Sequence, residues 1–462
     1  MVEETIYQGQ IPSSQPQVPA VQSVPATRNP KRGMIKWAIF LFILLSALFM
    51  ILGVLLPELS KPKDRNVILV YWGIREEPDT LRPVLSEFEK ENPNIKVNYV
   101  KQDAKDYKDK LITRINNGNG PDVFKFHNSW YETLQDALLP LPKETIEKKE
   151  FVDNYYTVAQ KDLIRNGAIY GIPIEMDTLT LFVNTKLFEE AAVSVPTTWQ
   201  EFIETSTKLT KRDDNGRITI AGAGIGTFDN VNHAPDIISL LFAQNGVNFD
   251  DFQNSKKQVT DALRFYTNFS LVENNVWDQT LDPSINAFSE GKLAMYFGYS
   301  SDYFVIKAAN PNLSFRLASS PQLLSDNRVN IASYFADGLS SKSENQKEAL
   351  LLLKFLARSE TQKKLYEAAS KTRAFGQPYG NKNLAEELKG TDGFIFADQA
   401  RSSISTPFTD GAGDDGLDNK LNASLKDAVL EILEGGSVEE ATNSLIEKYT
   451  QITEFLSPQP TK

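Results

Sequence analysis

The sequence predicts an α/β fold that follows a single membrane-spanning helix. Residues 37–56 are uncharged and mostly apolar, and such a run is long enough to cross a bilayer. From residue 67 onward, short runs rich in β-branched and aromatic residues alternate with segments of helical periodicity, which indicates strands that alternate with helices. The 462 residues exceed the roughly 250 to 300 that one hydrophobic core usually serves. We therefore expect more than one domain.

Composition and charge exclude several classes of protein. Hydrophobic residues make up 41% of the chain and aromatic residues 10%, which is typical of a folded protein rather than a disordered one. The 49 basic and 60 acidic side chains give a net charge of -11, which argues against a nucleic-acid partner. The absence of cysteine excludes disulfides, thiolate metal sites, cysteine nucleophiles and a lipid attached through an N-terminal cysteine. With only 2 histidines, we expect no metal site and no cofactor.

The N-terminal segment predicts a retained membrane anchor. Residues 1–33 contain 5 prolines and no apolar periodicity, and we expect them to form a disordered tail. At a rise of about 1.5 Å per residue, the apolar run spans about 30 Å, so residues 34–57 are expected to form a transmembrane helix and residues 58–66 a linker. A cleaved signal peptide would have a shorter apolar run and a small-x-small cleavage site, which is lacking here. Four basic residues precede the run and 3 follow it, so charge does not set its orientation.

The first elements beyond the linker predict a parallel sheet. Residues 67–72 form a continuous apolar run, typical of a strand buried on both faces. Apolar residues repeat at helical spacing over 81–88, and a strand-like alternation follows at 95–100. A strand, helix and strand of these lengths form a right-handed crossover with parallel strands. A helix over 107–115 and a strand over 122–126 extend the same α/β sheet.

The rest of the chain continues the alternation after one unusual segment. Residues 169–183 are extended over a length that exceeds an ordinary strand, and we interpret them as a segment that carries the chain between two sheets. Thr198 and Glu201 fit a capping box at the start of a helix, and residues 213–216 fit a tight turn. Further strands are expected at 217–221, 293–297 and 332–339, and further helices at 237–244, 262–269, 285–290, 344–358, 361–369, 421–433 and 438–455.

Eight short motifs occur in an order that is specific to one family. They read ILVYWG at 68–73, FEKENP at 88–93, YKDKL at 107–111 followed by GPDVF at 120–124, YGIP at 170–173, NTKLF at 184–188, PTTW at 196–199, FSEGKLAM at 288–295 and ALLLLKFL at 349–356. Over residues 67–455 the chain thus resembles the extracellular solute-binding proteins of ABC transporters, specifically the sugar-binding family that includes maltose-binding protein.

The resemblance implies a two-lobed, periplasmic-binding-protein-like (type II) fold whose lobes close around a ligand at a hinge. It places residues 67–172 and 331–378 in one lobe and residues 173–330 and 379–456 in the other. It also implies a monomer that captures a carbohydrate or related polar solute and delivers it to ABC permease subunits. A solute trap works on the outer face of the cell membrane, which puts the N-terminal tail in the cytoplasm. Relatives are often soluble or tethered by lipid on cysteine, whereas this chain carries a helix that would anchor it in the lipid bilayer.

The expected ligand contacts lie just after strands, because ligands of open α/β sheets bind at the carboxyl ends of the strands. Aromatic faces, carboxylates and amides at these positions suit a sugar. The resemblance implies contacts at Arg75, Glu76, Phe126, His127, Asn128, Trp130, Glu175, Asp177, Thr178, Tyr299, Ser300, Tyr334 and Asp337. It also implies contacts at Asp414 and Asp415, in an acidic, glycine-rich run that lacks the residue order of a calcium loop.

Several candidates have a second interpretation. Trp130 begins a segment whose apolar face suits the anchoring of a helix as well as ligand stacking, and His127 suits a hydrogen-bonded structural role. Glu175 and Asp177 would point to one face about 6 to 7 Å apart, a separation that glycoside hydrolysis tolerates. Nothing else in the sequence singles out an acid and a nucleophile, so we expect a binding protein and not an enzyme. A protein that binds or senses peptides or other solutes with the same fold is the alternative.

Overall fold

The computed structural model describes residues 31–51, 66–324, 327–408 and 417–456. The chain divides into two compact units, Met1–Arg65 and Asn66–Lys462. The first unit contains α1 (Lys31–Met50). Across the described residues, no helix combines the length and the apolar character that a membrane crossing requires. Residues 31–33, which were predicted to belong to the disordered tail, are the start of α1. The rest of the predicted tail, most of the linker and the last residues of the predicted anchor lie outside the described residues, so the anchor stays a prediction.

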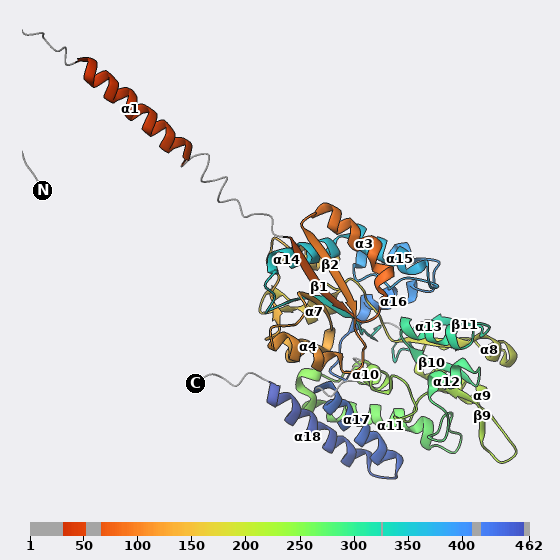
Figure 1. Cartoon of the computed structure of the whole chain (residues 1–462). Helices are drawn as coiled ribbons and strands as arrows, with labels where there is room; N and C mark the ends of the chain where they lie inside the picture. The colour runs from red at the N-terminus through yellow and green to blue at the C-terminus, as the bar shows by residue number, and fades with distance from the viewer. Residues whose placement is uncertain (1–30, 52–65, 325–326, 409–416, 457–462) are drawn as a thin grey trace, which may run out of the picture. The chain divides into compact units, whose positions relative to one another are not determined.

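One half of the second unit, which we call the first lobe, is built on a five-stranded sheet (Figure 1). Its strands are β1 (Val67–Gly73), β2 (Ile95–Lys101), β3 (Val123–His127), β4 (Leu138–Leu139) and β13 (Phe335–Ser340). The order is β2-β1-β3-β13-β4. β1 pairs in parallel with β2 and with β3, as the sequence predicted, whereas β13 returns antiparallel to β3.

Helices of the first lobe come from both ends of the unit. They are α3 (Pro78–Glu91), α4 (Tyr107–Asn116), α5 (Tyr131–Leu134), α6 (Lys148–Asn154), α7 (Thr157–Leu163), α14 (Gln346–Ala357) and α15 (Ser359–Ser370). In α3 the predicted apolar face is buried, and Pro83 lies inside the helix, beyond its first turn, because the helix begins at Pro78. Phe88 of α3 packs on Phe355 of α14, so two helices far apart in sequence close the same core.

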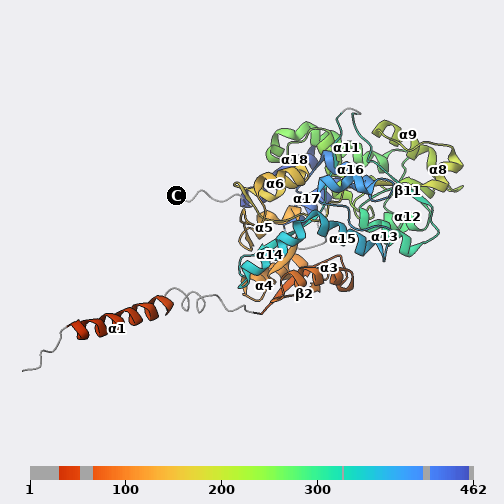
Figure 2. The same ribbon diagram turned by 90° about the horizontal axis from the view of Figure 1, so that it is seen from above.

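The other half, which we call the second lobe, is built on a separate sheet with the order β11-β7-β10-β9-β8. Its strands are β7 (Thr180–Asn184), β8 (Lys211–Arg212), β9 (Ile218–Ala223), β10 (Leu293–Gly298) and β11 (Phe315–Ala318). Its helices are α8 (Thr185–Ala191), α9 (Trp199–Leu209), α10 (Ala234–Gln244), α11 (Lys256–Leu271), α12 (Ser284–Ser289), α13 (Ser300–Ala309), α17 (Leu417–Leu433) and α18 (Val438–Leu456). The capping box at the start of α9 is confirmed. In Figure 2, α3, α4 and α14 of the first lobe lie towards the lower edge of the unit, and α9 and α11 of the second lobe lie towards its upper edge.

Three stretches of chain join the lobes. The long extended segment bridges β13 of the first lobe through Ile172 and enters β7 of the second lobe at Thr180, which confirms that it crosses between two sheets. A second crossing contains β12 (Asn330–Ile331), and a third contains β14 (Ser403–Ile404), which pairs in parallel with β12. The predicted strand at 332–339 is shifted to β13, because its first residues belong to the second crossing, where Ala332 bridges Thr178.

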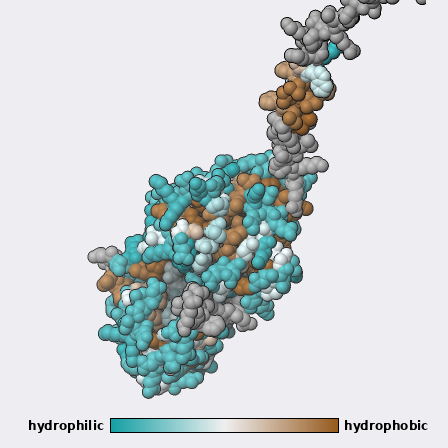
Figure 3. Space-filling model, turned by 90° about the vertical axis from the view of Figure 1, so that its left-hand side faces the viewer, coloured by the Kyte–Doolittle hydropathy of each residue, from teal (hydrophilic) through white to brown (hydrophobic). Residues whose placement is uncertain are grey.

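Each lobe has its own hydrophobic core. The core of the first lobe is drawn from residues 67–176 and 332–356, together with Ala400. The core of the second lobe is drawn mainly from residues 179–331 and 421–449. A small third cluster around Tyr379 and Leu388 lies in the connection, which contains η4 (Lys382–Leu388) and α16 (Phe394–Gln399). Hydrophilic side chains cover much of the face of this unit shown in Figure 3.

Candidate functional site

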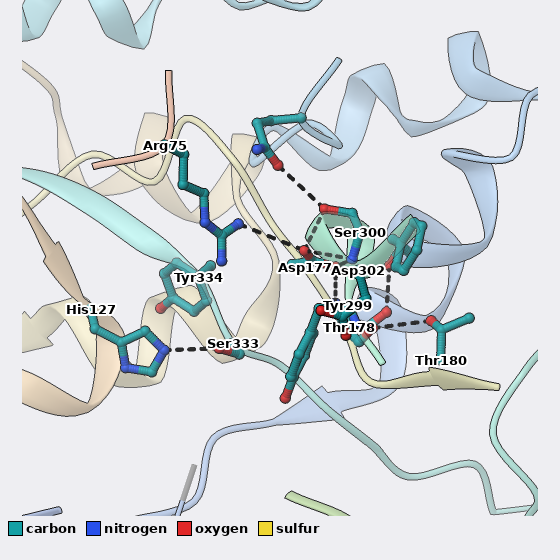
Figure 4. Close-up of polar contacts among 12 residues, drawn as sticks. Arg75, His127, Asp177, Thr178, Thr180, Tyr299, Ser300, Asp302, Ser333 and Tyr334 are labelled. Carbon is teal, nitrogen blue, oxygen red and sulfur yellow. Dashed lines mark hydrogen bonds and ion pairs between the residues drawn. The ribbon is translucent and has the colours of Figure 1, made fainter. Parts of the chain in front are cut away.

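A chain of polar contacts runs from the first lobe through the first crossing into the second lobe (Figure 4). Arg75 follows the end of β1, and its Nη1 lies 3.7 Å from Oδ2 of Asp177 on the crossing. Asp177 in turn accepts hydrogen bonds from Ser300, the first residue of α13, whose backbone N–H lies 3.1 Å and whose Oγ lies 2.5 Å from Oδ2. The backbone N–H of Thr178 donates to Oδ1 at 2.9 Å. Arg75, Asp177 and Ser300 therefore meet where the lobes meet.

The Asp177 carboxylate is held by donors rather than by solvent. Burial raises the pKa of Asp177 to about 6, although Arg75 and the hydrogen bonds from Ser300 and Thr178 act to lower it. Ser300 donates from the N-terminus of α13, where backbone N–H groups are free and the helix dipole favours an anion. The crossing is thus fastened to α13 through one carboxylate.

Two buried polar atoms at this junction have no hydrogen-bond partner among the described residues. They are Nη1 of Arg75 and Oε1 of Glu175. The Arg75 guanidinium lies 5.3 Å from the centre of the Phe335 ring, and the Glu175 residue is 4% exposed. An unpaired buried donor or acceptor costs about 1 to 3 kcal/mol, so each such atom calls for a water molecule or a ligand. One atom donates and the other accepts, which is the pair of functions that a hydroxyl group satisfies.

Glu175 lines a cavity of about 40 Å³ in the first lobe. Its polar lining includes Tyr71, Glu76, Lys125 and Gln377, and leucine side chains of α3, α14 and α15 form its apolar side. About 10 to 15 Å³ is enough to hold one water molecule, whereas pockets for whole ligands measure about 300 to 1,000 Å³. The cavity therefore suits a few water molecules beside Glu175 and not a complete ligand.

Four other predicted contacts lie inside the first lobe. Asp337 is fully buried in β13, where it accepts from the Tyr71 hydroxyl at 2.7 Å and from Lys125 Nζ at 3.3 Å. Burial raises the pKa of Asp337, and Lys125 opposes that rise. Phe126, Trp130 and Tyr334 are also buried, and Trp130 packs against Phe335 at 5.8 Å between ring centres. All four side chains are buried, and Asp337 lies near Glu175, because its partners Tyr71 and Lys125 line the cavity that Glu175 lines.

His127 and Asn128 have partners within the protein. The ring nitrogens of His127 lie 2.8 Å from Ser129 Oγ and 2.9 Å from Ser333 Oγ, and burial lowers the pKa of His127 to about 3. Asn128 accepts from the backbone N–H of Tyr334 at 3.1 Å and donates to Ser405 Oγ at 2.7 Å. Both residues fasten the end of β3 to the neighbouring connections, in agreement with the structural interpretation of His127.

Asn128 belongs to a buried network around a carboxylate that the sequence did not single out. Asp162 of α7 accepts from the Tyr334 hydroxyl at 2.7 Å and from Ser405 Oγ at 2.6 Å. Burial raises the pKa of Asp162 to about 6, while these donors act to lower it. Ser405 follows β14 on the third crossing, so the network ties that crossing to the first lobe.

Two more predicted contacts, Tyr299 and Thr178, lie at the end of β10 and on the first crossing. The Tyr299 hydroxyl donates to Asp236 at 2.6 Å, and the Tyr299 N–H donates to Asp302 at 3.0 Å. Thr178 is buried, and its Oγ1 donates to the Phe396 carbonyl at 3.1 Å. Asp414 and Asp415 lie outside the described residues.

Within the described ranges, no group of 3 or more His, Asp or Glu side chains is arranged to hold a metal ion.

Comparison with known proteins identifies the family. The family model for bacterial extracellular solute-binding proteins matches residues 73–363. This chain belongs to that family. The match spans both lobes, from the end of β1 into α15, and it confirms the membership that the eight motifs predicted.

Curated relatives of this solute-binding protein cover most of its length. The galactooligosaccharide-binding protein of Bacillus subtilis (strain 168) is 25% identical over 387 residues, which are 79% of this chain and 86% of the relative. The multiple sugar-binding protein of Streptococcus mutans serotype c is 22% identical over 346 residues, 71% of this chain and 78% of the relative. Both relatives are named as binding proteins and neither as an enzyme.

Solved structures of other solute-binding proteins share the fold. An ABC transporter solute-binding protein from Thermotoga lettingae TMO, bound with α-D-tagatose, superposes with a TM-score of 0.66 at 20% identity and covers 84% of this chain and 100% of its own. A cyclo/maltodextrin-binding protein complexed with maltotetraose gives a TM-score of 0.67 at 17% identity, covering 87% of this chain and 100% of its own. The two-lobed α/β fold that the sequence predicted is thereby confirmed.

Sequence reasoning did not single out two residues at the junction of the lobes. Arg373 pairs with Glu76 at 2.6 Å, and Gln377 lies 3.4 Å from Ser300 Oγ. Both follow α15 and precede the small third cluster, in a stretch without strand or helix. The predicted contacts were chosen because they follow strands, and these two residues follow a helix, so that criterion did not select them.

Proposed function

We propose that this solute-binding protein captures a carbohydrate between its lobes and presents it to the permease subunits of an ABC importer. The observation that carries the proposal is a pair of buried polar atoms at the junction of the lobes that make no hydrogen bond with the described residues: Arg75 Nη1, whose charged neighbour is Asp177 at 3.7 Å, and Glu175 Oε1. Sugar hydroxyls donate to carboxylates and accept from guanidinium groups, so both side chains suit a polyhydroxylated ligand, for which the 40 Å³ cavity beside Glu175 would have to widen. The names of the relatives, a galactooligosaccharide-binding and a multiple sugar-binding protein, support the same class of ligand.

In this proposal the ligand acts by stabilising contact between the lobes. Arg75 and Glu76 come from the first lobe, Ser300 and Tyr299 from the second, and Glu175, Asp177 and Thr178 from the crossing. A ligand that touches all three parts binds the closed arrangement more tightly than an open one, and the population shifts accordingly. The ligand would be bound and released unchanged, and we assign no catalytic residue.

We also propose that residues 34–57 anchor the protein as a monomer on the outer face of the cell membrane, with residues 1–33 in the cytoplasm. The described side chains of α1 support an apolar environment, since Trp37, Phe42 and Phe49 are each more than 70% exposed. Figure 3 shows the described part of this helix as mostly hydrophobic. A helix that is apolar on all sides requires lipid or a protein partner around it. The lobe boundaries predicted above, 67–172 with 331–378 and 173–330 with 379–456, are part of this proposal.

The proposal is tested by a thermal-shift screen of the full chain. Because the anchor requires detergent, and many detergents carry a sugar headgroup, an amine-oxide detergent is used. The panel contains mono-, di- and oligosaccharides, with amino acids and short peptides beside them. A ligand at 100 times its Kd adds about 2.7 kcal/mol to the folded state, so we expect a saturable rise in Tm with one class of sugar. A response to peptides or amino acids and none to sugars would overturn the carbohydrate assignment.

Anchoring is tested separately in membranes prepared from cells that express the chain. We expect the full chain to stay in the membrane fraction after a high-salt wash and a chain that starts at residue 61 to be released. Retention of the shortened chain in the membrane fraction would remove the anchoring role from residues 34–57.

A further inference from the structure

A second polar link between the lobes lies beside the candidate site. Nη2 of Arg373 lies 2.6 Å from Oε1 of Glu76. The two side chains are 19% and 12% exposed, so this ion pair is largely shielded from solvent. Glu76 belongs to the first lobe, where the Tyr99 hydroxyl of β2 donates to its carbonyl oxygen at 2.9 Å. The backbone at Glu76 is therefore held in place by the first sheet.

Arg373 lies near the end of the segment 331–378, which the predicted boundaries assign to the first lobe, but its side chain packs on the second lobe. Its guanidinium carbon lies 4.9 Å from the centre of the Phe304 ring on α13. Two residues further on, Phe375 packs on Tyr303 and on Phe304 of the same helix, with ring centres 5.0 and 4.9 Å apart. The Arg373 Nε donates to the Phe375 carbonyl at 3.0 Å, which fixes the side chain on its own loop. The guanidinium thus rests on the second lobe and reaches across to a carboxylate of the first lobe.

We propose that Arg373 is a latch that sets the affinity of this protein for its ligand without contacting the ligand. The inference rests on the proposed function in one respect, namely that binding requires the lobes to close. An ion pair between two lobes exists only while they are together, so it raises the fraction of ligand-free molecules in the closed state. The apparent Kd equals the intrinsic Kd divided by the fraction that is competent to bind. Loss of the latch therefore weakens binding even though every ligand contact is kept.

The chain contains a matched control for this residue. Arg358 also pairs with a glutamate, since its Nη1 lies 2.8 Å from Oε2 of Glu91, and its guanidinium carbon lies 5.2 Å from the centre of the Phe355 ring. Arg358 therefore combines the same two kinds of contact, but Glu91 and Phe355 both belong to the first lobe. A change at Arg358 removes the same two kinds of contact, in a more exposed ion pair, without separating the lobes.

The experiment measures the distance between the lobes in the absence of ligand. Because the chain has no cysteine, Lys149→Cys in the first lobe and Lys186→Cys in the second introduce the only thiols, and both positions are highly exposed. The full chain, in amine-oxide detergent, is labelled with a donor and an acceptor dye. Single-molecule energy transfer then reports the population of closed molecules.

We expect Arg373→Gln to lower the closed population and to raise the Kd of the sugar found in the screen about fivefold, the effect of an ion pair of moderate strength. Arg358→Gln should leave both quantities unchanged. Arg373→Lys keeps the charge and should recover part of the closed population. If Arg373→Gln does not fold, Glu76→Gln removes the same pair from the other lobe, and only its ligand-free distances are compared, because Glu76 is itself an expected ligand contact.

The outcomes separate this inference from the proposed function. An unchanged distance distribution in Arg373→Gln, or an equal change in Arg358→Gln, would overturn the latch. If no sugar binds, the carbohydrate assignment is wrong. The distances measured without ligand still show whether Arg373 holds the lobes together, so the latch is tested independently.

Discussion

At the end of β3, the ring nitrogens of His127 and the amide of Asn128 find partners among Ser129, Ser333, Ser405 and Tyr334. At the junction of the lobes, Arg75 Nη1 and Glu175 Oε1 are also buried, but they have no hydrogen-bond partner in the described part of the chain. Both regions carry polar residues just beyond strands, and burial alone does not tell them apart. The difference lies in the pairing of the atoms: the first region supports the structure, and the second has donor and acceptor capacity left for a ligand.

The largest expected effect is on stability, at Asp337. Asp337→Ala should lower the free energy of unfolding by about 3 to 5 kcal/mol, because it leaves the buried ammonium of Lys125 without its carboxylate. Urea unfolding at pH 7.5 measures the loss, and Asp337→Asn, which keeps an acceptor for Tyr71, should lose less. A variant as stable as the wild type that no longer binds ligand would move Asp337 into the ligand site.

Glu175 should show the opposite behaviour. Glu175→Gln keeps the shape of the side chain but removes its charge, so the affinity for the sugar should fall by about 1 to 3 kcal/mol, roughly 5- to 150-fold, while stability stays within about 0.5 kcal/mol. Calorimetric titration measures the affinity. Glu132→Gln, on the surface of the first lobe, is the control and should bind normally. Equal affinity of the Glu175 variant and the wild type would show that this carboxylate faces only water.

At low pH the protein should lose stability because the buried ring of His127 stays neutral in the folded state. The pKa of the folded state is about 3 against 6.5 for an unperturbed ring, so the unfolded chain takes up a proton below pH 6.5 and the folded chain does not. Stability contributed by the neutral ring is therefore lost as the pH falls. Between pH 7.5 and 5 the wild type should lose about 2 kcal/mol more than His127→Gln in urea unfolding. Parallel losses in the two proteins would mean that the ring is accessible to protons in the folded state.

At Asp162 the free energy of unfolding should change with pH in the opposite direction, and by a somewhat smaller amount. Its folded pKa of about 6 lies above the ordinary 3.8, so the folded state binds a proton more tightly and gains stability as the pH falls through 6. Relative to Asp162→Asn, the wild type should gain about 1.5 kcal/mol between pH 7.5 and 5. Denaturant titrations of both proteins at the two pH values measure the difference. A constant difference would indicate that the carboxylate stays ionised in its network with Tyr334 and Ser405.

The sequence was sufficient for the elements whose signals are local. The apolar repeat of α3, the capping box of α9 and the parallel pairing of β1 with β2 were all predicted, because side-chain spacing over a few residues determines them. The helices α6 and α7 fall in a stretch that showed no clear pattern, since each is only 7 residues long. Short helices depend on tertiary contacts more than on their own sequence.

The candidate site was harder to predict, because its contacts join distant residues. Asp337 was expected at the end of a strand, yet it lies in the third position of β13, where all 6 residues are buried and no alternation marks the inner face. Arg373 meets Glu76 across a separation of 297 residues. Neither pairing has a local signature, so only the folded arrangement distinguishes a carboxylate that is satisfied within the sheet from one that faces the junction.

The position of β13 has a consequence for synthesis. This strand lies between β3 and β4 in the first sheet, and its Asp337 is 212 residues from Lys125 on β3. At a translation rate of about 5 to 20 residues per second, β13 is synthesised on the order of 10 to 40 seconds after β3. During that interval the edge of β3 is unpaired while the second lobe emerges. An unpaired, apolar edge invites contact with other chains, so the nascent chain is most exposed to aggregation until β13 has been made.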